Sequence, residues 1–532
     1  LVARLSIADS DLDTAYRAYA TLLKTLDADD WEAYMGIIDV AVSMGGGKVE
    51  ALGTLFETLE AENALLRGPK LSKVALTNRV LAHPEIKRAD EVARLRTAVQ
   101  RYVDAFGGKP CCFGDLKTFL IPFVHTFGNS GEGSRQQQQQ AQQKQRALLV
   151  TYLQSQATAN SPRALVSQDK DDGSMPLKES LKCVRRCVTA HQLLRYIGEH
   201  HRTGAPPTAD VVTELVAEYK AAQSVHARVS AEEARKLAEK GPGMVSQVQR
   251  EFNCGDDFLL MAAHALLSGD PDDAQQDARS DGTGVLLLRN CEHGAASPMF
   301  WQRCLQALAC LQVAHKASPD NFHLRLLIMR LCSEMGAFDA IVPHYDNLGP
   351  KHVQLETLSF LMLDAALDAV AVDAATQLCE RIVHFHKDNT ERVPEYMQVA
   401  FEHANVAQVQ KFHVFREKLL HSITLARARA ERGVLMFSRK RTPGEDMSVV
   451  HNFLKERILF QGVSTDVSPG DEFFADLSMD VLHAMKSNDD KNVMLSWNPP
   501  VVSGASVATS GGGENREQKE VGKKGEEIGG VG

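Results

Sequence analysis

The stretch Ser318–Gly349, SPDNFHLRLLIMRLCSEMGAFDAIVPHYDNLG, decides the fold of this chain. Four apolar residues recur at i, i+3, i+4 and i+7, which predicts a helix with one apolar stripe: Leu324, Leu327, Ile328 and Leu331. Asp320 or Asn321 can cap its start, and Gly336 can take the left-handed conformation that ends it. A second helix follows at once, with an inner face expected to hold Ala337, Ala340, Ile341 and Tyr345. Neither helix can bury its apolar face alone, so the pair predicts one unit of a stacked helical repeat.

The composition extends this prediction to the whole chain. Of 532 residues, 44% are hydrophobic and only 6% aromatic, with many strong helix formers. The pattern of Leu12–Leu26 predicts one amphipathic helix, and a second helix is expected after Asp30. The spacing of these two helices is close to the tetratricopeptide repeat length of about 34 residues. Trp31 matches the tetratricopeptide consensus, although Gly36 lies one place later than the glycine of that consensus. We expect an all-α fold, an α-α superhelix of tetratricopeptide-like repeats, with low-complexity insertions and a disordered C-terminal tail.

Composition shifts divide the chain into seven segments. Three are expected to be helical: repeats at 1–128, a middle block at 177–267 and a second array at 298–437. A glutamine-rich insertion and polar linker, taken as a loop, occupies 129–176, and a polar junction occupies 268–297. The region 438–503 has weak signals, and 504–532 has almost nothing to bury, which predicts a disordered tail.

Charge and cysteine usage narrow the class of protein. The net charge of −9 argues against a dedicated nucleic-acid binder, and we expect no DNA partner. The ten cysteines show no framework spacing, which favours a reduced, cytosolic or nuclear compartment, and we expect a cytoplasmic protein. The apolar run Leu358–Val372 contains Asp364 and Asp368 and is too short to span a bilayer, so no membrane partner is expected. The start at Leu1, without methionine, is what a fragment lacking its own N-terminus would show.

The motifs that could carry chemistry are weak. Arg279–Gly284 matches the R-x-x-G-x-G loop that holds acetyl-CoA in GNAT acetyltransferases, but an acidic segment without a strand pattern precedes it, which favours a flexible loop. Cys183, Cys187 and His191 would align on a helix, yet a fourth zinc ligand and a C-x-x-C pair are missing, so core packing is the better interpretation. We therefore expect no catalytic, cofactor-binding or metal-binding residues.

A basic cluster lies near the end of the second array. It comprises Arg427, Arg429, Arg432, Arg439, Lys440 and Arg441. Two interpretations stay open, a solvated helix face or an attachment to RNA phosphate, for example on a ribosome.

Three groups of residues, taken in order, point to a family. The quoted segments are Arg67–Lys73 (RGPKLSK), Lys109–Lys117 (KPCCFGDLK), and Asn321–Arg330 (NFHLRLLIMR) with Gly336–Phe338 and Lys351–Leu358. Together they resemble the large auxiliary subunit of N-terminal acetyltransferase B (NatB), and KPCCFGDLK is the most specific of them. The resemblance covers roughly Asp11 to Arg432, with interruptions.

The resemblance implies a non-catalytic scaffold that wraps a small GNAT subunit and helps bring it to the ribosome. The family's complex acetylates nascent chains that begin Met-Asp, Met-Glu, Met-Asn or Met-Gln. Acetyl-CoA and substrate would belong to the partner, so this chain needs no cofactor. The alternative is a tetratricopeptide-type adaptor of another cytosolic complex, and a third class is a stand-alone transferase using Arg279–Gly284.

Candidate partner contacts come from the same segments. They are Arg67, Lys109, Asp115, Lys117, Arg325, Arg330, Lys351, Gln354 and Glu356. Asp115 is expected to begin a helix, while Cys111–Phe113 either packs a repeat junction or contacts the partner. At the start of the later helix we expect buried Val353 and Leu355, with Gln354 and Glu356 exposed. Arg325 and Arg330 either reach solvent or pair with an acid from a neighbour or partner.

Overall fold

A computed structural model describes the following parts of the chain: residues 2–83, 85, 90–124, 134–168, 176–199, 206–238, 253–268, 298–440 and 486–490. Every regular element in these ranges is a helix, apart from an isolated bridge between Ser422 and Lys486. The expectation of an all-α fold is thus confirmed. In these ranges, no helix is long and apolar enough to cross a membrane. The chain divides into two compact units, 1–286 with 497–532 and 287–496, which are described one at a time.

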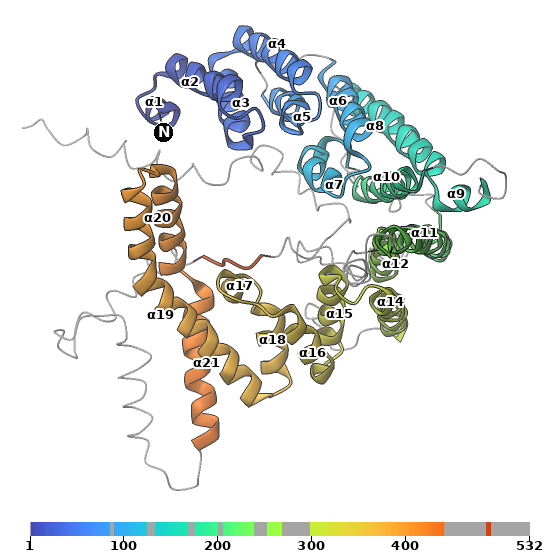
Figure 1. Cartoon of the computed structure of the whole chain (residues 1–532), viewed down its shortest axis with the longest axis vertical. Helices are drawn as coiled ribbons and strands as arrows, with labels where there is room; N and C mark the ends of the chain where they lie inside the picture. The colour runs from blue at the N-terminus through green and yellow to red at the C-terminus, as the bar shows by residue number, and fades with distance from the viewer. Residues whose placement is uncertain are drawn as a thin grey trace, which may run out of the picture. The chain divides into compact units, whose positions relative to one another are not determined.

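Unit 1 is a series of helices, coloured blue to green in Figure 1. They are α1 (Val2–Ala8), α2 (Leu12–Thr25), α3 (Trp31–Met44), α4 (Gly46–Glu62), α5 (Gly68–Leu81), α6 (Glu91–Phe106), α7 (Cys112–Leu116), α8 (Ser134–Ala159), α9 (Pro162–Gln168), α10 (Leu177–Tyr196), α11 (Thr208–Ala238) and α12 (Asp256–Ser268). Two short 3-10 turns, η1 (Lys117–Phe119) and η2 (Ile121–Phe123), follow α7. The main contacts join helices close in sequence, as expected of a repeat array.

The hairpin of α2 and α3 shows how the sequence sets these elements. Asp11 and Asp30 cap the two helices, since their side chains accept hydrogen bonds from backbone N–H groups of the first turn. Gly36 lies where the helices approach, and a Cβ there would stand 2.5 Å from the Tyr19 ring. The glycine displaced from the repeat consensus therefore still serves close helix packing.

Helix α8 corrects the sequence interpretation of 129–176. The polar composition of the glutamine run predicts a loop insertion, but Ser134–Ala159 forms one helix of 26 residues. Its second half supplies buried Leu149, Val150 and Leu153, and α8 packs against α6 and α10. Glutamine is a good helix former, so the polar run can extend a helix that these apolar residues anchor.

Unit 2 continues in the same manner, from yellow-green to orange in Figure 1. Its helices are α14 (Pro298–Ala317), α15 (Phe322–Glu334), α16 (Phe338–Leu348), α17 (Val353–Thr357), α18 (Phe360–Asp368), α19 (Val372–Glu402), α20 (Val406–Leu420) and α21 (Ile423–Lys440). Packing again joins near neighbours, with α19 also contacting α17 and α21.

The α15–α16 hairpin largely follows the sequence prediction. Asn321 caps α15 through its side chain, and Gly336 adopts φ 69° just after the helix. On α16, Ile341 and Tyr345 are buried as expected. Ala337 and Ala340, expected on the same inner face, are exposed instead.

Candidate partner-binding site

Two candidate segments of unit 1 meet around the carboxylate of Asp115, together with Tyr102, which the sequence did not mark as a candidate. The Tyr102 hydroxyl on α6 donates to Asp115 Oδ2 at 2.7 Å, and Arg67 Nη1 lies 3.4 Å from both carboxylate oxygens. Burial, followed by the hydrogen bond to Asp115, raises the pKa of Tyr102. A hydrogen bond to Cys111, partly offset by burial, raises the pKa of Arg67, whose side chain remains 47% exposed. The node of Arg67, Tyr102 and Asp115 thus joins the start of α5 and helix α7 to α6, with its arginine at the surface.

Helix α7 begins earlier than expected. It starts at Cys112, three residues before Asp115, so Asp115 lies inside the helix. Cys112 and Phe113 are buried, and the Phe113 ring meets that of Tyr196 edge-on at 5.7 Å. Both side chains therefore pack the junction between repeats, whereas Cys111 is partly exposed.

The two candidate lysines of unit 1 flank α7. Lys109 is exposed before it, and Lys117 is half-buried just after it. In the neighbouring RGPKLSK segment, the Lys70 and Lys73 ammonium groups both lie near Glu60, at 3.8 and 2.5 Å. Of the basic residues in these two segments, Arg67 and Lys109 are exposed, whereas Lys70, Lys73 and Lys117 are half-buried.

In unit 2, Arg325 and Arg330 pair with acids of their own chain. Arg330 Nη2 lies 2.9 Å from Glu334 Oε1, one helical turn away, and both side chains are largely buried. Arg325 Nη2 reaches only 4.0 Å from Asp320, whose side chain is 67% exposed. Of the two arginines, Arg325 is thus the one with the weak partner.

The start of α17 differs from the sequence prediction. Lys351 and Gln354 are exposed, and Gln354 Oε1 accepts a hydrogen bond from the Lys351 N–H at 3.1 Å. Leu355 is buried as expected, but Val353 is 43% exposed. Glu356, expected to be exposed, is only 1% exposed, so it is not a surface contact.

Glu356 instead organises a buried polar network. His386 Nε2 lies 2.8 Å from Oε2, while the Ser422 hydroxyl and the Asn488 amide donate to Oε1 at 2.5 and 2.8 Å. Burial alone would raise the pKa of Glu356, but these hydrogen bonds outweigh it and lower the pKa. The sequence does not predict these contacts, because His386, Ser422 and Asn488 lie 30, 66 and 132 positions from Glu356. A local pattern carries no signal for such distant contacts.

The same network holds a short segment, residues 486–490, against α17 and the start of α21. Backbone hydrogen bonds join Lys486 to His421 and Ile423, and Asp490 N–H donates to the Thr357 carbonyl at 2.9 Å. Residues 486–490, which we call the strap, therefore tie α17 to the start of α21. The network and strap have a structural role in unit 2.

The basic cluster on α21 is partly occupied by internal acids. Arg427 lies 2.5 Å from Asp364 and 3.8 Å from Glu431, and Arg432 lies 3.8 Å from Glu380. Arg429 forms no ion pair within the described ranges, and burial lowers its pKa. Arg439 and Lys440 belong to the last turn of α21, while Arg441 lies outside the described residues.

The remaining chemical candidates add no site. Cys183, Cys187 and His191 are buried on α10, and burial raises the thiol pKa of both cysteines and lowers the pKa of His191. Among the residues that the structure describes, no group of three His, Cys, Asp or Glu is placed to hold a metal. Arg279–Gly284 lies outside the described residues.

Comparison with known proteins decides the family. The family model described as the N-acetyltransferase B complex (NatB) non catalytic subunit matches residues 31–466. The chain belongs to this family. The family is described as that of a non-catalytic subunit, which the resemblance also implied.

Members of the NatB family from distant organisms show the same similarity. The human NatB auxiliary subunit is 25% identical over 442 residues, which are 82% of this chain and 36% of that protein. The mouse protein is 26% identical over 375 residues, 70% of this chain and 31% of that one. The fission yeast NatB complex subunit arm1 is 27% identical over 173 residues, 32% of this chain and 19% of that one. The chain thus spans about a third of the length of the mammalian relatives.

A solved structure is also similar. It is a chain of the NatB acetyltransferase complex bound to a bisubstrate inhibitor, 13% identical, with a TM-score of 0.26. The match covers 93% of this chain and 68% of that one.

Proposed function

We propose that this chain is a scaffold that binds a GNAT-type NatB catalytic subunit and supplies no catalytic residue of its own. The observation that carries the proposal is the match of the NatB non-catalytic family over residues 31–466. A stacked helical array also suits the role, because each repeat adds surface without requiring a catalytic centre. Acetyl-CoA would be held by the partner.

We further propose the setting in which the scaffold acts. The complex would work in the cytoplasm, at the ribosome, on nascent chains that begin Met-Asp, Met-Glu, Met-Asn or Met-Gln. Support comes from the family, together with the basic residues on α21 that could meet ribosomal RNA phosphate.

The contact surface in unit 1 would be centred on Arg67 and Lys109. Both side chains are exposed. The Asp115 carboxylate accepts a hydrogen bond from Arg67, and the Tyr102 hydroxyl donates to the same carboxylate. An arginine fixed in this way loses less side-chain entropy when it binds, which favours a contact. In unit 2, the exposed Lys351 and Gln354 are the corresponding candidates.

Co-expression with a NatB-type catalytic subunit tests the scaffold role. We expect the two chains to elute together in size-exclusion chromatography and to acetylate a Met-Asp peptide faster than the catalytic subunit alone. The pure chain should transfer no acetyl group. Separate elution, or transfer by the pure chain alone, would overturn the proposal.

Substitution at the surface tests its location. Arg67→Ala should weaken binding of the catalytic subunit, whereas Arg101→Ala, at an exposed arginine of α6 in the same unit, should leave it unchanged. Isothermal titration of both variants makes the comparison. Equal affinities for the two would remove Arg67 from the contact surface and leave the family assignment intact.

A further inference from the structure

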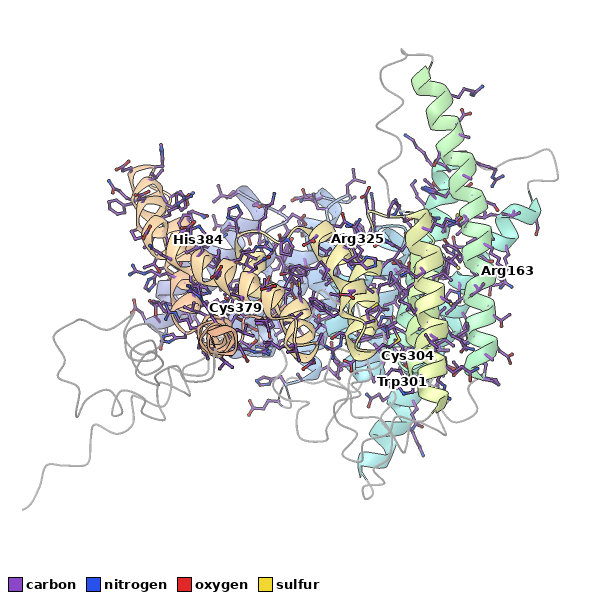
Figure 2. All side chains as sticks on the ribbon, turned by 90° about the horizontal axis from the view of Figure 1, so that it is seen from below. Arg163, Trp301, Cys304, Arg325, Cys379 and His384 are labelled. Atoms are coloured by element: carbon purple, nitrogen blue, oxygen red, sulfur yellow. The ribbon has the colours of Figure 1, made fainter. Side chains whose placement is uncertain are left out.

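Three basic side chains gather at one end of the α14–α16 layer. Because α14, α15 and α16 follow one another up and down, the end of α14, the start of α15 and the end of α16 come together. These positions carry His315, Arg325 and His344, and the two imidazole rings lie 5.1 Å apart. Figure 2 shows Arg325 at the end of this layer away from Trp301, which marks the start of α14.

Two buried nitrogen atoms of this cluster form no hydrogen bond within the described ranges. Arg325 Nε and His315 Nδ1 are buried and form no hydrogen bond. Arg325 pairs with Asp320 at 4.0 Å, and the exposed side chain of Asp320 makes this pair weak and solvent-screened. Buried polar groups are nearly always hydrogen-bonded, so the two unpaired atoms of Arg325 and His315, with the half-buried His344 beside them, call for an acceptor. A negatively charged oxygen is the acceptor that all three can serve.

The charge of the cluster selects the kind of anion. Burial, together with the nearby Arg325, lowers the pKa of His315, and burial, His315 and Arg325 lower that of His344. Both rings are therefore neutral near pH 7, where each can still donate one N–H. The guanidinium is then the single positive charge, which matches one carboxylate. A phosphate group carries a charge near −2, which this single cation would not balance.

We propose that His315, Arg325 and His344 form a docking site for an aspartate or glutamate side chain of a partner protein. The guanidinium donates to the carboxylate, and the imidazoles donate to its remaining lone pairs. The inference rests on the proposed function only for the identity of that partner, the NatB catalytic subunit. The site itself is defined by this chain alone.

The first test uses sodium acetate as a carboxylate probe on the whole chain. Acetate is titrated at constant ionic strength against isotope-labelled histidine, and the ring signals of His315 and His344 are followed by NMR. We expect saturable shifts of both signals that disappear in Arg325→Gln and persist in Arg416→Gln, an exposed arginine of α20. Equal shifts in the two variants, or none in the unaltered chain, would overturn the proposal. Tighter binding of inorganic phosphate than of acetate would overturn the choice of carboxylate.

A second variant guards against loss of folding. If Arg325→Gln melts far below the unaltered chain, His344→Asn takes its place, because His344 is only half-buried. We expect it to weaken acetate binding at the His315 signal. An undiminished shift of His315 would then count against the three-residue site.

The complex provides the second arm of the test. Arg325→Gln should raise the Kd for the catalytic subunit by roughly ten- to hundredfold, the usual loss when a hydrogen bond to a charged group is removed. If the unaltered chain does not bind the catalytic subunit at all, the proposed function fails while the acetate titration still decides the site. If it binds and Arg325→Gln binds equally well, the docking inference fails alone.

Discussion

At the scale of single residues, Gly68 shows how tightly unit 1 is packed. Its N–H donates to Asp29 Oδ1 at 2.5 Å, and a Cβ at this position would stand 2.7 Å from that oxygen and 2.8 Å from the buried Tyr34 ring. The start of α5, which places Arg67, therefore depends on the absence of a side chain. The RGPKLSK segment carries this glycine for a packing reason that is separate from any partner contact.

We expect Gly68→Ala to lower the free energy of unfolding of unit 1 by about 1–3 kcal/mol, the usual cost of overpacking. Thermal unfolding followed by circular dichroism measures it. Gly53→Ala is the matched control, because nothing lies within 4 Å of a Cβ there and alanine is the better helix former. A Tm for Gly68→Ala equal to or above that of the control would show that unit 1 accommodates the added methyl group without loss of stability.

At the scale of elements, the strap and α17 depend on one ionised carboxylate. The pKa of Glu356 is lowered in the folded chain, so its stabilising contribution is present above the pKa of an unfolded glutamate, about 4.3. That contribution is lost as the pH falls through the lower, folded pKa. Protonation removes the negative charge that accepts from Ser422 and Asn488.

We therefore expect Glu356→Gln to lower the Tm of unit 2 at neutral pH, and the difference from the unaltered chain to shrink below about pH 4. Melting curves from pH 7 to pH 3 measure both. Glu395→Gln, at an exposed glutamate of α19, controls for the loss of one negative charge. A difference that is constant over this range would mean that the ionised state of Glu356 does not stabilise the strap.

The proposed ribosome contact of α21 can be tested separately from the ion pair between Arg427 and Asp364. Replacing Arg429, Arg439 and Lys440 with glutamine should weaken salt-dependent co-sedimentation with ribosomes, because phosphate contacts are electrostatic. Arg427→Gln should instead lower the Tm, because it removes the partner of Asp364. Equal sedimentation of the triple variant and the unaltered chain would exclude α21 from ribosome attachment.

The sequence predicts local features of these elements well and distant ones poorly. Helix periodicity, the Asn321 cap and the Gly336 stop follow from residues a few positions apart. The placement of Glu356 could not be predicted, because its burial is imposed by His386 and by the strap, far along the chain. The Arg67–Asp115 pair, 48 positions apart, is hidden for the same reason.

The same limit applies to the proposed docking site in unit 2. Arg325 stands out in the sequence, because it is a charged residue on an otherwise apolar helix. The two histidines that converge on it come from α14 and α16, and nothing in their own segments marks them. Their meeting follows only from the up-and-down order of three helices.

At the scale of the whole molecule, a chain of neighbour contacts implies local rather than global cooperativity. Helices in each unit pack mainly on those next in sequence, and repeat arrays of this kind gain stability from each interface nearly independently. A defect in one unit should then open that unit and spare the other.

Hydrogen–deuterium exchange of two variants tests this expectation. Gly68→Ala should speed exchange in α3–α6 and leave α17–α21 unchanged, and Glu356→Gln should do the reverse. The unaltered chain gives the reference rates for both units. Faster exchange throughout the molecule in either variant would show that the two units unfold as one. Local opening would instead mean that a partner contacting one unit stabilises that unit alone, since a ligand adds stability only to the elements that it requires to be folded.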